Sequence, residues 1–149
     1  MTRVCLVGSE DVHLQYELLA SETARAALSS YDISEPWENT LAVSTVSLGA
    51  AVTLLNDLHW YVVRYTDDVL LWDESVSETE WLSEGLARDI REEDRDPAET
   101  GTLLKIYGVV DGRLVEPMYV QRVDDSYPSY DLRDVEDTVP VRITEAEFG

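Results

Sequence analysis

Apolar positions along the chain follow both a period of two residues and a period of three to four, which predicts a mixture of strands and helices. Arg3 to Val7 is a short apolar run closed by turn residues, so it predicts a buried strand. Residues 12–18 alternate apolar and polar side chains, which predicts a second strand that forms a hairpin with the first. A helix over 12–20 is the alternative, because Leu18 leads directly into a helical pattern.

The middle of the chain predicts two helices among short strands. Ser21 is a favourable N-cap for a helix ending near Tyr31, and Ser47 for a helix whose apolar stripe ends at Leu58. The segment between Asp32 and Asn39 reads as a loop. Three runs have the composition of strands: 41–46, 60–65 and 69–72, the last two joined by a turn at 66–68.

The second half of the chain contains clearer local signals. Ser77 and Glu80 have the spacing of a capping box, which predicts a helix over 78–91. Residues 96–99 predict a single helical turn, stopped by Gly101. Two strand-like runs, 103–110 and 113–123, are joined by Asp-Gly and predict a tight hairpin. Residues 139–143 predict a last strand, and Pro140 favours a place at the sheet edge.

Frequent hairpins among the predicted elements favour an α+β fold, with a mainly antiparallel sheet and about three helices packed on one face. A parallel doubly wound sheet is disfavoured, because its strands would need helical crossovers. The length of 149 residues fits a single globular domain over 1–149. Within it, residues 124–137 predict an irregular acidic segment.

The composition is strongly acidic, with 31 acidic against 11 basic residues and a formal net charge of -20. The acids are spread along the chain, which favours adaptation of the whole surface to molar salt over mimicry of a phosphate backbone. A basic stripe is missing, so we expect no nucleic-acid binding. We also expect a cytoplasmic protein that does not enter a membrane, because no apolar run reaches about 18 residues.

The residue types that most often carry catalysis are scarce. Cys5 and His13 would lie on opposite faces of the predicted hairpin, so they do not predict a nucleophilic pair. His59 reads as a boundary residue, and two His with one Cys are too few for a zinc site. Glycine-rich phosphate loops are also missing from the sequence. We therefore predict no catalytic residue, metal or cofactor.

Two sets of side chains are candidates for binding. Aromatic residues near loops and strand ends could contact a protein partner, since exposed aromatics anchor interfaces: Trp37, Trp72, Tyr127 and Tyr130. Arginines could clamp an anionic ligand through paired hydrogen bonds: Arg64, Arg113 and Arg122.

Four segments resemble a family of short haloarchaeal proteins of unknown function: MTRVCLVGSED, YELLASETARAAL, ENTLAVSTVSLGAAVTLLNDLHWY and YGVVDGRLVEPMYV. The resemblance covers about residues 1–123 and implies a halophilic host, but it implies no activity. The leading hypothesis is a non-enzymatic protein-binding or regulatory module. The alternative is a small enzyme or an anionic-ligand-binding protein that uses scattered Arg and carboxylate residues. Mimicry of nucleic acid is a third hypothesis.

Overall fold

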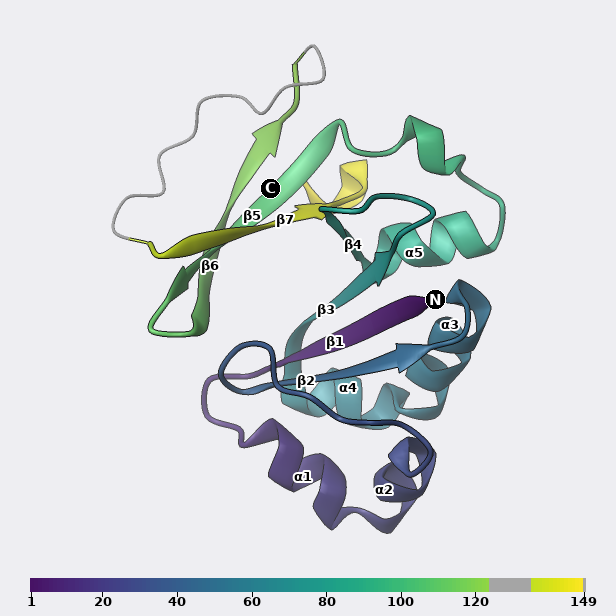
Figure 1. Ribbon diagram of the computed structural model, residues 1–149, viewed down its shortest axis with the longest axis vertical. Helices are drawn as coiled ribbons and strands as arrows, with labels where there is room; N and C mark the ends of the chain where they lie inside the picture. Colours follow the sequence, from purple (N-terminus) through teal and green to yellow (C-terminus); the bar gives the residue numbers. More distant parts are fainter. Residues whose placement is uncertain (124–134, 149) are drawn as a thin grey trace.

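The computed structural model describes residues 1–123 and 135–148. Within these residues seven strands form one sheet in the order β2-β1-β3-β4-β7-β5-β6 (Figure 1). The strands are β1 (Thr2–Gly8), β2 (Thr40–Thr45), β3 (Thr66–Asp73), β4 (Trp81–Ser83), β5 (Leu103–Val110), β6 (Arg113–Gln121) and β7 (Asp137–Arg142). All neighbouring pairs are antiparallel except β4 and β7, which are parallel.

Five α-helices and two short 3-10 helices accompany the sheet in the described part of the chain. The α-helices are α1 (Leu14–Ala20), α2 (Glu22–Leu28), α3 (Leu48–Asp57), α4 (His59–Tyr65) and α5 (Glu84–Arg91). The 3-10 helices are η1 (Pro97–Glu99) and η2 (Glu145–Glu147). The predicted α+β class with a mainly antiparallel sheet is confirmed, whereas the structure has five α-helices where about three were expected.

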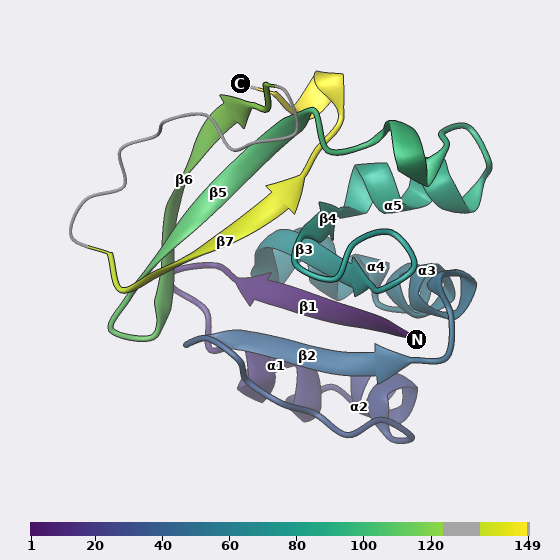
Figure 2. The same cartoon turned by 45° about the horizontal axis from the view of Figure 1, so that its top comes forward.

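One side of β1, β2, β3 and β4 packs against helices in the main hydrophobic core (Figure 2). The strands contribute Val4, Leu6, Leu41, Val43, Val69, Leu71 and Leu82. Buried side chains of α1, α2, α3 and α5 fill the same cluster. This interior is large enough to fix the helices, because each fully buried Leu contributes about 1.5–3 kcal/mol.

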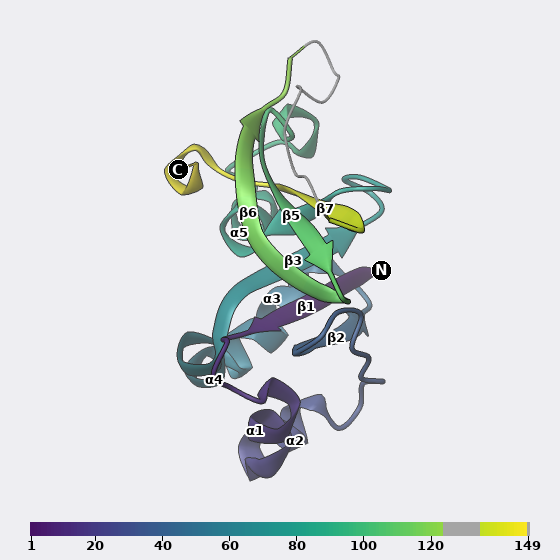
Figure 3. The ribbon, with the colours of Figure 1, turned by 90° about the vertical axis from the view of Figure 1, so that its left-hand side faces the viewer.

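The opposite side of the same strands faces the second half of the sheet. Cys5 and Leu70 lie in a buried cluster with Tyr107 and Val141, which come from β5 and β7. The sheet is therefore strongly bent, and Figure 3 shows the β5–β6 hairpin running toward β1 and β2. At the hairpin turn the Gly112 carbonyl accepts a hydrogen bond of 2.8 Å from the backbone N–H of Glu38.

The β5–β6 hairpin is confirmed, together with its Asp-Gly turn. Asp111 and Gly112 have φ angles of 52° and 76°, as a two-residue turn between twisted antiparallel strands requires. The predicted strand over 3–7, the helix capped by Ser47 and the single turn after Asp96 are also present. These elements all carry strong local signals.

The predicted strand over 12–18 is wrong, because this segment forms helix α1. Leu14 and Leu18 are four residues apart and both fully buried, so they lie on one helical face. The side chain of Asn39 accepts a hydrogen bond of 3.0 Å from the backbone N–H of Leu14 at the helix start. Strand β1 consequently pairs with β2 and β3, and the predicted hairpin with its Cys5–His13 register does not exist.

The predicted strand over 60–65 is also wrong, because α4 occupies these residues. Val63 is 63% exposed and Trp60 is 51% exposed, so much of the apolar content that favoured a strand faces solvent. The Tyr61 hydroxyl forms a hydrogen bond of 2.6 Å with the hydroxyl of Ser21, the residue just before α2. Tyr61, Val62 and Tyr65 also pack against the main core, and this tertiary packing overrides the local preference for a strand.

Pro140 does not mark a sheet edge as predicted, because β7 lies between β4 and β5. The β4 pairing reaches only Val141 and Arg142, whereas the β5 pairing extends over the whole of β7. Pro140 therefore lies in a stretch of β7 that has a paired neighbour on one side alone. An edge strand also has a paired neighbour on one side alone. Proline is tolerated in both places, because it has no backbone N–H to donate to a second neighbouring strand.

Candidate functional site

The segment before β4 carries the first residue of the candidate site. The Ser77 hydroxyl accepts hydrogen bonds from the backbone N–H groups of Thr79 and Glu80, at 3.2 and 3.0 Å. The predicted start of the helix over 78–91 is wrong, because β4 follows and α5 begins only at Glu84, capped by the Ser83 hydroxyl. The rest of that prediction is confirmed, since α5 covers Glu84–Arg91. Glu80 is therefore not a capping residue, and its carboxylate turns into the protein.

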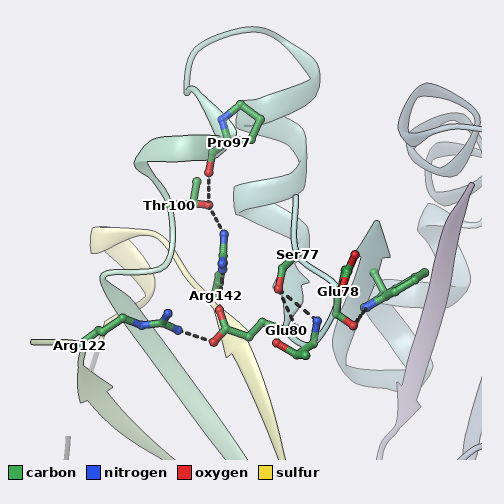
Figure 4. A network of polar contacts seen from close by, with 9 residues as sticks. Ser77, Glu78, Glu80, Pro97, Thr100, Arg122 and Arg142 are labelled. Carbon is green, nitrogen blue, oxygen red and sulfur yellow. Dashed lines mark hydrogen bonds and ion pairs between the residues drawn. The ribbon is translucent and has the colours of Figure 1, made fainter. Parts of the chain in front are cut away.

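Glu80 is only 3% exposed and lies between two arginines (Figure 4). Its Oε1 atom accepts a hydrogen bond of 2.7 Å from Arg142 Nε, and its Oε2 atom pairs with Arg122 Nη2. The side chains of Arg142 and Arg122 are themselves 14% and 19% exposed. All three charges are thus withdrawn from bulk water, where hydrogen bonds between charged groups are strong.

Sheet register explains why these side chains converge. Arg142 on β7 lies opposite Leu104 on β5, which lies opposite Val120 on β6. Arg122 is two residues beyond Val120 and shares its face, because side chains alternate along a strand. Glu80 lies two residues before Leu82. Leu82 in turn pairs with Arg142 where β4 and β7 run parallel. Three segments that are distant in sequence therefore meet at one end of the sheet.

Arg142 is fixed further by the segment around η1. Its Nη1 atom donates a hydrogen bond of 3.0 Å to the Thr100 hydroxyl, which donates one of 2.7 Å to the Pro97 carbonyl. Gly101 has a φ of +100°, and a Cβ at this position would come within 3.0 Å of Arg142 Nε. The glycine backbone therefore lies directly against the guanidinium group.

A hollow of about 900 Å³ opens over this arrangement. Its lining is mainly polar and comes from the segment after β3, from η1 and its flanks, and from the two arginines: Ser75, Val76, Asp96, Pro97, Ala98, Glu99, Thr100, Gly101, Thr102, Arg122 and Arg142. Glu80 is not part of the lining, so it lies behind the arginines and holds them in place.

The charges at the base of this hollow favour a bound anion. Two guanidinium groups lie at the base of this hollow, in a chain whose net charge is -20. A guanidinium group offers several N–H donors in a rigid plane, which suits carboxylate and phosphate oxygens.

Comparison with known proteins gives one match. The model of a family of unknown function (DUF5804) matches residues 2–109. The chain belongs to this family. No curated protein and no solved structure matches it. Glu80 and Thr100 lie inside the region that matches the DUF5804 model, whereas Arg122 and Arg142 follow it in the chain.

The three arginines predicted to bind an anion are not brought together in this DUF5804 member. Arg64 stacks on Trp60, with its guanidinium carbon 3.8 Å from the ring centroid. Arg113 pairs at 3.3 Å with Glu38 on the surface. Of these three predicted arginines, Arg122 is the one that lines the hollow.

Sequence reasoning missed Arg142 and Glu80, which complete the arrangement around Arg122. The capping-box pattern assigned Glu80 to a helix start, and Arg142 lay at the end of a strand with no pattern around it. Only the strand order, with β7 between β4 and β5, brings them together.

The predicted aromatic interface is not gathered on one surface. Trp37 packs edge-on against Trp81 with ring centroids 5.8 Å apart, and Trp72 donates a hydrogen bond of 3.3 Å to the Glu78 carbonyl. Trp37 and Trp72 are half-buried and pack against the cluster around Cys5. Tyr127 and Tyr130 lie outside the described residues.

A second buried polar cluster joins the two halves of the sheet. One carboxylate oxygen of Asp68 on β3 accepts hydrogen bonds from both Lys105 and Tyr107 on β5. Lys105 is the only lysine in the chain. Burial, and next the Asp68 charge, raise the pKa of the Tyr107 hydroxyl far above its usual value. This cluster therefore keeps Tyr107 protonated and ties β3 to β5.

Cys5 lies on the same inner side of the sheet and is fully buried. Burial raises the pKa of its thiol to about 12, against a weaker opposing hydrogen bond from Thr40. The thiol is therefore protonated at neutral pH. Across residues 1–123 and 135–148, no group of three or more His, Cys, Asp or Glu residues is placed to hold a metal ion. In the same residues no helix is long and apolar enough to cross a membrane.

Proposed function

We propose that this protein binds a small anionic ligand in the hollow over Glu80, with Arg122 and Arg142 as the groups that hold the oxyanion. The observation that carries this proposal is the convergence of two largely buried guanidinium groups at the base of a polar hollow of about 900 Å³. It develops the hypothesis of an anionic-ligand-binding protein, with Arg142 in place of Arg64 and Arg113.

Preorganisation of Arg142 supports the proposal. The side chain is held by Glu80, by Thr100 and by the backbone of Gly101. A flexible arginine loses up to about 2 kcal/mol of side-chain entropy when it is immobilised. Since Arg142 is already immobilised, an arriving anion loses little binding free energy to this ordering.

The proposal is for binding and not for turnover. The lining of the hollow, as the described residues form it, contains hydroxyl and carboxylate groups but no His or Cys that could serve as a base or nucleophile near neutral pH.

Titration calorimetry with inorganic phosphate at one fixed KCl concentration tests the proposal. We expect saturable binding to the full chain and about tenfold weaker binding to Arg142→Gln and to Arg122→Gln, because hydrogen bonds to charged groups contribute about 1.5–3 kcal/mol each. Arg113→Gln is the matched control, since it also removes one positive charge but from the surface pair with Glu38.

Two outcomes would contradict the proposal. One is the lack of saturable binding of phosphate, and of a simple carboxylate such as succinate, to the intact protein. The other is equal weakening by Arg113→Gln, since overall charge would then govern the affinity. If Arg142→Gln does not fold, Arg142→Lys keeps the charge but loses the planar fork, and we expect it to weaken binding while retaining the folded circular dichroism spectrum.

The hypothesis of a protein partner stays a prediction. Its support from Trp37 and Trp72 is weakened, because both side chains are half-buried in the second core cluster. Trp60 and Val63 on α4 are among the large apolar residues that are exposed to such a partner. Loss of partner capture by a Trp60→Ala variant would favour this role over ligand binding.

A further inference from the structure

The walls of the hollow carry charges of both signs. The arginines come from the sheet side, while Asp96 and Glu99 come from η1 and its flank. Figure 4 shows η1, marked by Pro97 and Thr100, on one side of Arg142, with Arg122 and Glu80 on the other side. The hollow thus lies between a cationic base and an acidic wall.

The two acidic side chains of this wall are only partly compensated: Glu99 interacts with the charge of Arg95 without pairing with it, and Arg95 itself pairs with Asp89 and Glu145. Asp96 uses one oxygen to accept a hydrogen bond of 2.9 Å from the backbone N–H of Ala98. In the described part of the chain, neither Asp96 nor Glu99 forms an ion pair within 4.0 Å, and both residues are exposed. The wall would repel a ligand that carries negative charge alone, so a ligand that also carries a positive charge should bind more tightly than a simple anion.

We propose that the ligand is a zwitterion that carries an oxyanion and a primary ammonium group. Arg122 and Arg142 take the carboxylate or phosphate, and Asp96 and Glu99 take the ammonium group. This inference rests on the proposed function, because it names the class of ligand for the same hollow.

The lining also indicates which kind of cation fits. Recognition of a quaternary ammonium group relies on aromatic rings, and among the described residues the lining includes no Trp, Tyr or Phe. A primary ammonium group instead needs hydrogen-bond acceptors, which the Asp96 and Glu99 carboxylates and the Ser75 hydroxyl supply. The chemistry of the wall therefore favours a primary amine over a fully methylated one.

Paired ligands that differ only in the amine test this inference by titration calorimetry of the full chain. O-phosphoethanolamine is compared with ethyl phosphate, and β-alanine with propionate, so that phosphate and carboxylate ligands are distinguished. We expect each zwitterion to bind about two- to fivefold more tightly than its partner, because exposed ion pairs contribute about 0.2–1 kcal/mol.

Two double variants test whether the Asp96 and Glu99 charges cause the preference for the zwitterion. The double variant with Asp96→Asn and Glu99→Gln keeps the oxygen that caps Ala98 but removes both charges. We expect it to lose the preference for the zwitterion and to bind ethyl phosphate more tightly. The control double variant with Glu92→Gln and Asp94→Asn removes the same charge outside the hollow, and it should keep the preference.

The outcomes separate this inference from the proposed function. If ethyl phosphate and O-phosphoethanolamine bind equally to the unmodified protein, the hollow binds anions but the zwitterion is excluded. A preference that persists without the Asp96 and Glu99 charges also overturns the inference. If none of the four ligands binds, the proposed function fails together with it.

Discussion

Arg142 Nε donates a hydrogen bond of 2.7 Å to Glu80 Oε1 across 62 positions of the sequence. The contact joins the end of β7 to the segment before β4 and places Arg142 at the base of the hollow. Since Glu80 also pairs with Arg122, one buried carboxylate contacts both groups proposed to bind the ligand.

Replacing Glu80 with Gln should lower the free energy of unfolding by about 3 kcal/mol, because it removes a buried negative charge that pairs with two largely buried guanidinium groups. Chemical denaturation followed by circular dichroism measures this change. Glu38→Gln is the matched control: Glu38 pairs with Arg113 at the surface, where both side chains are more than half exposed, so we expect less than about 1 kcal/mol. Similar losses in the two variants would show that burial of Glu80 adds nothing to the pairing.

Replacing Gly101 with Ala should weaken both folding and phosphate binding. Ala is strained at a φ of +100°, and its Cβ would push against the Arg142 guanidinium. We expect a loss of about 1–3 kcal/mol in unfolding free energy and a measurable loss of affinity in calorimetry.

Gly112→Ala separates backbone strain from contact with Arg142. Gly112 also has a positive φ, of +76°, but a Cβ there meets no atom within 4 Å. We expect this variant to lose stability while its phosphate affinity stays unchanged. An equal loss of affinity in both glycine variants would mean that global destabilisation, and not the position of Arg142, controls binding.

Alkaline pH should destabilise the protein through Cys5. Because the folded-state pKa is about 12 against 9.0 for a free thiol, the native state retains a proton that the unfolded state releases. The stabilisation is therefore complete below pH 9.0 and declines above it, by about 1.4 kcal/mol per pH unit. The raised pKa of Tyr107 acts in the same direction at higher pH.

Denaturation of the protein and of Cys5→Ala at pH values on either side of 9.0 measures this contribution. We expect a shallower decline in the alanine variant. The unfolding free energies of the two proteins would fall in parallel if Cys5 were not the group that titrates.

Added KCl should stabilise the fold, because the net charge of -20 repels itself most strongly at low ionic strength. The screening length falls from about 10 Å at 0.1 M salt to about 3 Å at 1 M. We expect the thermal midpoint in circular dichroism to rise across this range. An unchanged midpoint would remove salt adaptation as the explanation of the acidic composition.

Elements with strong local signals were predictable from the sequence. The Asp-Gly turn fixes the β5–β6 hairpin by its backbone preference, and the Ser47 hydroxyl accepts the hydrogen bond that starts α3. The segments that form α1 and α4 were predicted as strands. For α1 a helix over 12–20 was the open alternative, because Leu14, Tyr16 and Leu18 alternate as in a strand while Leu14 and Leu18 also have the spacing of a helix face. Only packing against α2 and the sheet decides between the two periods.

The candidate site was less predictable than the fold because it depends on strand order. Arg122 was a candidate in sequence, but nothing in the chain around Arg142 indicates that β7 inserts between β4 and β5. Glu80 has a local interpretation as a capping residue, which the long-range pair with two arginines overrides. Buried charge networks of this kind are non-local, so residue spacing does not reveal them.

Side-chain NMR of the arginine Nε–H groups during a phosphate titration tests the central claim most directly. The account predicts that the signals of Arg122 and Arg142 shift together and saturate, while those of Arg64 and Arg113 remain in place. Uniform small shifts of all four signals, or saturating shifts confined to Arg64 or Arg113, would contradict it.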